Sequence, residues 1–374
     1  MIFLPLFFDI IFKDINFIQL KSKNILKLLK SNNTFTNVQK SKKFFGWMFF
    51  CLFCSYSMNS QEVHFSQLSQ NQTNVNPAFS GIMFGPRINL QYRNQYPTIG
   101  TGVNSGYNTY FASYDQHFHA INSGFGFQVL GDKLAGNILS RYSFELMYSY
   151  QLKFNRYQAL RIGLSGNLNL QQIDFSQLKF YDQIDPILGF NSNNATAEDL
   201  SNNYNTSFFN TNVGLVYFTS DYYIGVSAKN LLPKKNFFNE ENSTFHYTLL
   251  SLQLGAVKRF GSDKEYALFP FLEYDRQASN QKIVGNLLGQ YKIYNLGMGF
   301  RHNFESMESI MLMTGINLNR FRISYSYDIG TNALSSYTGG SHEIGIRVLI
   351  GGENNSLTPN EHKEILECPD FLKN

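Results

Sequence analysis

The sequence predicts an all-β fold, a transmembrane antiparallel β-barrel of about 14 strands like those of outer membranes. Three observations lead to this prediction. Aromatic residues make up 16% of the 374 residues and charged residues only 16%, where about a quarter charged is usual. Apolar and polar residues alternate along many segments, and the connections between these segments are alternately long and short. Together these features favour a sheet that crosses a bilayer.

Residues 1–60 are interpreted as a leader. Within it, residues 40–60 read KSKKFFGWMFFCLFCSYSMNS: lysines, then a short apolar run at 44–53, then small residues. This order is typical of a secretory signal peptide. An N-terminal anchor helix is the alternative, but the apolar run is shorter than a bilayer-spanning helix needs. Residues 1–39 are expected to be an over-extended translation start.

Charge and cysteine content exclude some classes of protein. The leader holds eight lysines and two aspartates, so the rest of the chain carries a net charge of −2 although the whole chain is +4. A basic surface for nucleic acid is therefore not predicted. Cys368 is the only cysteine after the leader, which leaves no disulfide framework and no cysteine-based metal site.

The alternation is clearest at residues 141–154, RYSFELMYSYQLKF. One face carries only apolar residues, and Met147 is the single apolar residue of the other face. The same pattern recurs at 158–171, 320–329 and 341–350. A period of two residues indicates β-strands with one apolar face. In a membrane barrel that face contacts lipid, and the polar face lines the lumen.

The predicted strands reach about ten residues, the length that a tilted strand needs to cross a bilayer and more than the usual strand of a soluble sheet. A secreted soluble sandwich or a propeller would also alternate, but with shorter strands or an internal repeat. The fourteen predicted strands are 86–93, 108–117, 123–132, 141–154, 158–173, 211–219, 222–229, 248–260, 266–276, 282–290, 293–303, 309–317, 320–329 and 341–350.

The connections between these strands predict the orientation. Every second connection is short, and most of the others are long, which gathers the long loops at one end, as in outer-membrane barrels with short periplasmic turns. Closure removes the unpaired backbone groups that lipid cannot satisfy. An even strand number places both termini in the periplasm. The expected interfacial aromatic girdles include Tyr142, Phe154, Tyr157, Tyr217, Phe218, Tyr222 and Tyr223.

The predicted domain organisation has four parts. Residues 1–60 form the leader, 61–85 a periplasmic N-terminal segment, 86–350 the barrel and 351–374 a periplasmic tail. A short helix is expected within the tail at 359–367, because Pro359 suits a first helical turn.

No motif predicts catalysis, and the chain is expected not to be an enzyme. It has no Gly-x-Ser-x-Gly and no His-Glu-x-x-His pattern. A surface enzyme would need a Ser–His pair in the barrel wall, and none stands out. His117 and His119 have a spacing that could ligate a metal, but they fall at a turn. No metal and no cofactor are therefore predicted.

Three blocks near the start of the predicted barrel carry a family resemblance. They are HFSQLSQNQTNVNPAFSG at 64–81, YRNQYP at 92–97 and YFASYDQHF at 110–118. In this order and spacing they resemble the PorP/SprF family of outer-membrane proteins of the type IX secretion system. The family usually has Trp where this chain has Tyr96. Beyond residue 118 the resemblance is one of strand architecture and length.

The resemblance implies a non-enzymatic role in the outer membrane. Family members work with the large translocon barrel and support the export and surface retention of particular substrates, including gliding adhesins with a C-terminal targeting domain. A structural role is expected for the matching residues, with partner binding as the alternative, and Arg93 and Asp115 are candidates for a lumen-side ion pair. The matching residues are Asn76, Pro77, Ala78, Phe79, Gly81, Tyr92, Arg93, Gln95, Pro97, Ser113, Tyr114, Asp115 and Gln116.

A second function stays open on the sequence alone: a porin or transporter for small solutes suits a fourteen-stranded barrel equally well. The block TNVNPAFSG is predicted to fold against or into the barrel base and to fix where the first strand begins. Pro77 biases Asn76 towards an extended backbone, and Gly81 can supply the positive φ that a tight turn requires.

Overall fold

The structure is a computed structural model. It describes residues 64–83, 85–99, 106–134, 138–155, 157–174, 178, 180–185, 189–190, 204–232, 247–261, 265–331 and 335–350. The chain divides into two units, 1–58 and 59–374, and all described residues lie in the second. The predicted leader and the predicted tail with its helix at 359–367 lie outside the described residues.

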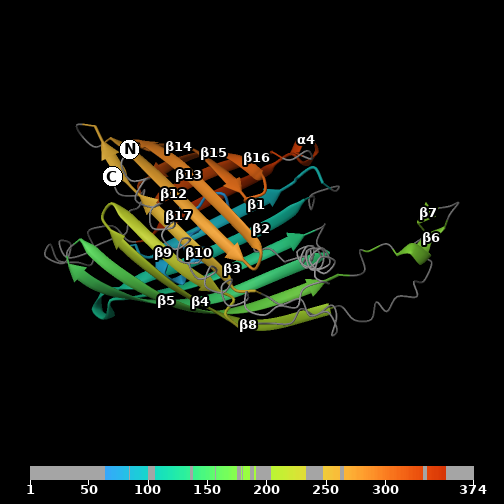
Figure 1. Cartoon of the computed structure of the whole chain (residues 1–374), viewed down its shortest axis with the longest axis horizontal. Helices are drawn as coiled ribbons and strands as arrows, with labels where there is room; N and C mark the ends of the chain where they lie inside the picture. The colour runs from blue at the N-terminus through green and yellow to red at the C-terminus, as the bar shows by residue number, and fades with distance from the viewer. Residues whose placement is uncertain are drawn as a thin grey trace, which may run out of the picture. The chain divides into compact units, whose positions relative to one another are not determined.

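Long antiparallel strands make up most of the described chain (Figure 1). Short helical turns are α3 (Gln72–Val75), η1 (Pro77–Phe79), η2 (His119–Ile121), η4 (Tyr181–Gln183) and α4 (Ser335–Thr338). The strands are β1 (Arg87–Gln95), β2 (Tyr107–Phe118), β3 (Ser123–Leu134), β4 (Leu139–Asn155), β5 (Gln158–Ile173), β6 (Ile184–Asp185), β7 (Gly189–Phe190), β8 (Tyr204–Thr219), β9 (Tyr222–Lys229), β10 (Leu249–Ala256), β11 (Lys258–Phe260), β12 (Tyr266–Gln277), β13 (Asn280–Tyr291), β14 (Tyr294–His302), β15 (Met307–Leu318), β16 (Phe321–Gly330) and β17 (Ser341–Leu349).

The sheet closes on itself. β1 pairs with β2 on one side and with β17 on the other, in a register that runs from Arg87↔Leu349 to Gln95↔Ser341. β10 and β11 both pair with β12 and count as one strand, interrupted at Val257. Across the described residues this gives a closed barrel of 14 antiparallel strands, with β6 and β7 as a separate hairpin. The predicted fold class is confirmed.

The wall is apolar outside and polar inside. In β4, Leu146 points outward and is 67% exposed, while its neighbours Glu145 and Met147 point inward and are buried. Exposure of these apolar outward side chains to water would be unfavourable, so they suit contact with lipid. The polar side chains of the opposite face contact other polar groups in the lumen. Among the described residues no helix is both long and apolar enough to cross a bilayer.

The strand boundaries differ from prediction mainly at two places. β8 begins at Tyr204 and not at 211, because the Asn- and Ser-containing stretch at its start pairs with the far end of β5. The segment predicted as one strand at 248–260 is broken, since the Val257 amide leaves the ladder and donates to the carbonyl oxygen of Asp221 at 2.7 Å.

Short connections follow β2, β4, β8, β11, β13 and β15, and they gather at one end of the barrel. The connections at the other end include the longest ones, after β1, β5 and β9, and also the tight β12–β13 turn at 278–279. In Figure 1 the end with the longest connections is on the right, where α4 also lies.

Two predicted girdle residues point into the barrel. Phe218 and Tyr223 are buried, whereas their neighbours Tyr217 and Tyr222 face outward. The prediction for Phe218 and Tyr223 is wrong because adjacent residues of a strand face opposite sides of the sheet. The two inward rings contribute to an apolar cluster at the short-connection end of the lumen.

Candidate functional site

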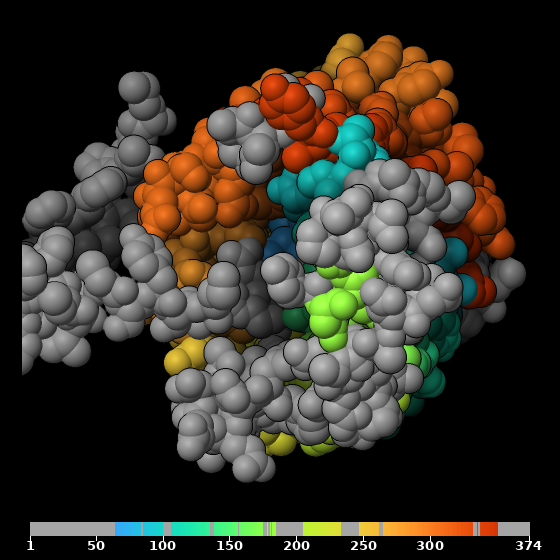
Figure 2. Space-filling model, turned by 90° about the vertical axis from the view of Figure 1, so that its right-hand side faces the viewer, coloured from blue at the N-terminus to red at the C-terminus, as the bar shows by residue number. Residues whose placement is uncertain are grey.

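The N-terminal segment, residues 64–83, fills the lumen. Ser66, Asn76 and Ser80 are 0% exposed, and Phe79 is 1% exposed. In Figure 1 this blue segment lies among the strands. Figure 2 faces the end with the longest connections, and blue atoms are visible inside the opening between teal and orange strands. The sequence predicts a periplasmic position for residues 61–85, whereas the structure places residues 64–83 inside the barrel.

The first part of the segment is held by charged groups of the wall. The Ser66 and Gln67 amides donate to the two carboxylate oxygens of Glu343, at 2.8 and 3.1 Å. The Ser66 hydroxyl donates to Asp328 at 2.6 Å. Arg93 connects the two acidic residues, with its guanidinium nitrogens 3.1 Å from Glu343 and 2.9 Å from Asp328. All five side chains are buried, and the guanidinium finds both carboxylates within the lumen, while Arg93 Nε and Asp328 Oδ1 have no hydrogen-bond partner there.

Asn76 and Pro77 fix the middle of the segment. Asn76 is extended, at φ −146° and ψ 118°, as the following proline predicts. Its side-chain oxygen accepts from the Ala78 amide at 2.9 Å and caps η1. Its side-chain nitrogen donates to the Leu215 and Val226 carbonyls of the wall, at 3.3 and 3.2 Å. One amide side chain therefore shapes the segment and attaches it to β8 and β9.

Two wall glycines let the segment come close. A Cβ atom on Gly163 of β5 would lie 2.2 Å from the Ala78 nitrogen, and one on Gly214 of β8 would lie 1.9 Å from the Asn76 side-chain oxygen. Distances below 3.0 Å are not tolerated without movement. Glycine within a strand is typical of such a close backbone approach, and here it makes room for the Asn76–Ala78 stretch.

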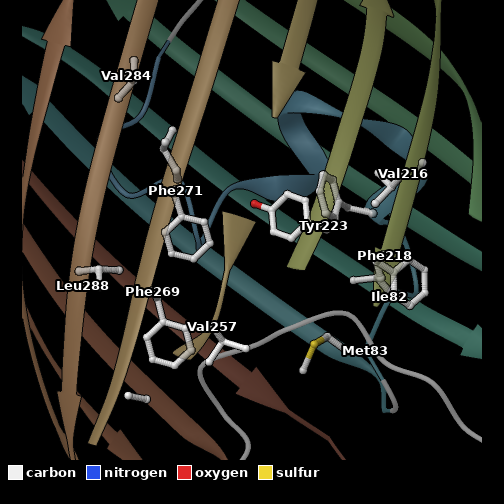
Figure 3. Close-up of a cluster of buried hydrophobic side chains, with 14 of the residues drawn as sticks. Ile82, Met83, Val216, Phe218, Tyr223, Val257, Phe269, Phe271, Val284 and Leu288 are labelled. Atoms are coloured by element: carbon white, nitrogen blue, oxygen red, sulfur yellow. The ribbon is translucent and has the colours of Figure 1, made fainter. Parts of the chain in front are cut away.

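The last part of the segment packs into an apolar cluster (Figure 3). The Phe79 ring meets Tyr223 edge to face, with ring centroids 5.2 Å apart and planes at 82°. Ile82 and Met83 lie in the same cluster. The wall contributes Val216, Phe218, Tyr223, Val257, Phe269, Phe271, Val284 and Leu288 to it.

The turn at Gly81 leads towards the first strand. Gly81 has φ +63°, as predicted, and its amide donates to Asp115 at 2.7 Å. A Cβ on Gly81 would lie 2.6 Å from the Gln116 carbonyl oxygen. Asp115 also binds Arg87, the first residue of β1, at 2.8 Å, and both side chains are buried. This arrangement ties the turn to the start of β1.

Arg93 and Asp115 both form buried ion pairs, but not with each other, so the predicted pair between them is wrong. The register of β1 and β2 sets Arg93 opposite Thr109 and Arg87 opposite Asp115. Arg93 reaches Glu343 and Asp328 on the other side of β1, and Asp115 binds Arg87.

The remaining motif residues face different surroundings. The Ser113 hydroxyl accepts from Asn89 at 3.2 Å inside the barrel. Tyr92 lies on the outer side of β1, where its hydroxyl donates to Asn108 at 2.7 Å. Tyr114 and Gln116 alternate with Ser113 and Asp115 on β2 and point outward, joined by a hydrogen bond of 2.7 Å. Gln95 and Pro97 lie at the end with the longest connections, where Gln95 lines a cavity.

That cavity opens at the end with the longest connections and has a volume of about 440 Å³. Its wall carries basic and acidic side chains, among them Arg141, Arg301, Lys282 and Asp132, and His64 of the N-terminal segment also lines it. His64 lies 3.3 Å from Asp275 of β12. Burial and the positive charges of Lys282, Arg301, Lys229 and Arg93 lower the pKa of His64 well below its usual value, so its imidazole is neutral at pH 7.

Several residues that hold the segment were not among the predicted site residues. Ser66 and Gln67 lie in the block at 64–81, and Arg87 lies five residues before the block at 92–97. Asp328 and Glu343 lie far along the chain, on the polar faces of two predicted strands. Their inward position could be predicted from alternation, but their contact with Ser66 depends on the closure of the barrel.

The closed antiparallel wall, its apolar outer surface and its filled polar lumen define an outer-membrane β-barrel with an internal N-terminal segment. The chain belongs to the family described as type IX secretion system membrane protein PorP/SprF, whose model matches residues 57–348. The match covers the internal segment and every barrel strand except the last residue of β17, which confirms the resemblance seen in the three sequence blocks. The chain is therefore a type IX secretion-associated outer-membrane barrel.

Solved structures with a similar fold have low sequence identity. The CymD monoaromatic hydrocarbon channel is 11% identical, with a TM-score of 0.45, over 79% of this chain and 96% of that one. The outer membrane protein Omp33 of Acinetobacter baumannii is 8% identical, with a TM-score of 0.41, over 72% of this chain and 100% of that one. A comparison with curated proteins finds no match.

Proposed function

We propose that this barrel is a non-enzymatic accessory of type IX secretion that supports export and surface retention of specific substrates such as gliding adhesins. Its partners would be the translocon barrel and a secreted adhesin or its C-terminal targeting domain. The family membership supports the secretion role. The lumen filled by residues 64–83 supports a docking role over a conducting one.

The filled lumen argues against the alternative, an open porin or small-solute transporter. Charged hydrogen bonds attach the segment to β16 and β17, its backbone passes close to β5 and β8, and its apolar end packs at the base. A solute would have to displace all three sets of contacts. The cavity of about 440 Å³ above the segment is open at the end with the longest connections and offers a place for a partner to dock.

The orientation is part of the proposal. β1 begins and β17 ends at the end that gathers the short connections, and we place that end in the periplasm. The first residue of β1 and the last residue of β17 then both lie on the periplasmic side. In chain order, the segment 64–83 then runs from His64 near the outer mouth down through the lumen to the periplasmic end.

The proposal is tested in cells that secrete through a type IX system. We expect an affinity-tagged chain to co-purify with the translocon barrel and with one or a few secreted substrates. Deletion of the gene is expected to remove those substrates from the cell surface and to leave general outer-membrane permeability unchanged. Loss of uptake of a small solute, with surface proteins intact, would instead establish the transporter function and reject the secretion role.

A further inference from the structure

A cluster of three potential metal ligands lies in the lumen near the end with the longest connections. His64 comes from the N-terminal segment, and Glu273 and Asp275 come from β12. One ligand atom from each residue lies within 4.8 Å of the others. Neither the family membership nor the contacts that hold residues 66–83 require this cluster.

The two carboxylates come together because of the strand. Glu273 and Asp275 are two positions apart on β12, so both point to the same, inner face. Both are buried, at 6% and 5% exposure. Two ionised carboxylates at such a distance repel one another, and burial strengthens the repulsion. Either a shared proton or a cation can relieve it.

Two neighbouring cations have acidic partners outside the cluster. Lys282 lies 3.9 Å from Glu308, and Arg301 lies 3.4 Å from Asp328. The positive charge of Lys229, the last residue of β9, also attracts the Glu273 carboxylate. The cluster itself brings together one imidazole and two carboxylate groups, which are ligand types that bind divalent transition metals.

The cluster is accessible. His64 lines the cavity of about 440 Å³ at the mouth, and together with Asp275 it lines a second cavity of about 200 Å³. Three protein ligands beside an open space leave a position for water, which is common for zinc sites with an open coordination position. By contrast, the Nδ1 atom of His117 lies 3.4 Å from a guanidinium nitrogen of Arg161, and among the described residues His117 belongs to no group of three potential ligands.

We propose that His64, Glu273 and Asp275 form a binding site for a divalent transition-metal ion of the Zn²⁺ type. An imidazole nitrogen with two carboxylate oxygens suits Zn²⁺ better than Mg²⁺, which prefers oxygen ligands and keeps its waters. Because one ligand belongs to the internal segment and two belong to the wall, the ion cross-links the top of the segment to β12. Metal binding then stabilises the filled lumen by mass action.

The experiment uses the full-length protein, purified in detergent and stripped with a chelator. Zn²⁺ is added, and bound metal is counted after gel filtration, with Mg²⁺ in a parallel titration. The variants are His64→Ala, Glu273→Gln and Asp275→Asn, of which the last two keep side-chain shape. His342→Ala is the matched control, since it removes an imidazole that bonds the Tyr325 hydroxyl on the outer face. Heat-modifiable migration in gels checks that every variant is folded.

We expect one equivalent of Zn²⁺ on the wild type and on His342→Ala, and at least about tenfold weaker binding when one ligand is removed. Zn²⁺ should also slow hydrogen exchange of the amides near residue 64 in the wild type but not in Asp275→Asn. Equal Zn²⁺ binding by the wild type and His64→Ala would overturn the site. So would a preference for Mg²⁺, or a folded wild type that binds no metal, which would leave a shared proton between the carboxylates. Each result is independent of whether the barrel acts in secretion.

Discussion

The two halves of the internal segment are held in different ways. Ser66 and Gln67 lie in a polar network with Arg93, Asp328 and Glu343, where each contact is a directed hydrogen bond or ion pair. Leu68, which follows them, belongs to the apolar cluster. Residues 78–83 end in an apolar cluster with Phe218, Tyr223 and other wall side chains. Polar wall groups thus bind both halves, because Asp115 and Arg161 also bond the backbone of Ser80 and Gly81. The second half in addition supplies most of the segment's residues in the apolar cluster.

The two kinds of contact contribute differently to the position of the segment and to the stability of the filled barrel. A buried ion-pair network gains little net free energy, because the desolvation of its charges offsets their attraction, but it is costly to break. Burial of Phe79 removes apolar surface from water, which is favourable in any register. We infer that the apolar cluster supplies most of the stabilisation and that the polar network determines which residues of the segment face which strand.

The largest effect is expected from Arg93→Met. The change leaves Glu343 buried without its guanidinium partner and leaves Asp328 with Arg301 alone, at a cost of about 5 kcal/mol. Hydrogen exchange of the amides at 64–71 should accelerate strongly, while exchange in β4 and β5 stays slow. The double variant Arg93→Met with Glu343→Leu should recover part of the protection. If the single variant exchanges like the wild type, the polar network does not hold the segment.

Phe79→Ala comes next, at about 4 kcal/mol, because it leaves a cavity in the apolar cluster. Exchange should accelerate at 77–83 more than at 64–71. Phe154→Ala serves as a control, since that phenylalanine is exposed on the outer wall. Uniform acceleration over the whole segment would show that its two halves do not open separately.

Gly163→Ala is expected to cost about 2 kcal/mol through overpacking, because the new Cβ would meet the backbone of Ala78. Gly289→Ala is the matched wall substitution, since its nearest contact would be an ordinary 3.7 Å. Thermal unfolding and exchange at 76–80 measure both. Equal behaviour of the two variants would mean that the segment does not pass close to β5.

The smallest effect is expected from Gln70→Ala. It removes a hydrogen bond of 2.9 Å to the Ser324 hydroxyl, worth about 1 kcal/mol. Exchange at 68–72 should rise by about fivefold, since 1.4 kcal/mol corresponds to a factor of ten in local opening. If amide exchange accelerated as much as in Arg93→Met, Gln70 would be a main anchor of the segment, and the central role of Arg93 would be contradicted.

Much of the wall could be predicted from the sequence, because a lipid-facing sheet imposes strict alternation. The inward position of Arg93 and Asp115 follows from that alternation, but their partners follow from register, which the sequence does not determine. Aromatic residues at strand ends predict an outward girdle position for Phe218 and Tyr223, but Tyr222 and Tyr223 are adjacent in one strand and face opposite sides. The contact between His64 and Asp275 joins residues more than half the chain apart, and no pattern connects them.

Ionic current through the full-length protein in a planar bilayer tests the central claim most directly, namely that residues 64–83 close the lumen. We expect no steady open current from the wild type and frequent transient openings from Arg93→Met, because its segment detaches more often. Phe154→Ala should behave like the wild type. A wild-type barrel that stays open, with the same conductance as Arg93→Met, would contradict a lumen filled by its own N-terminal segment.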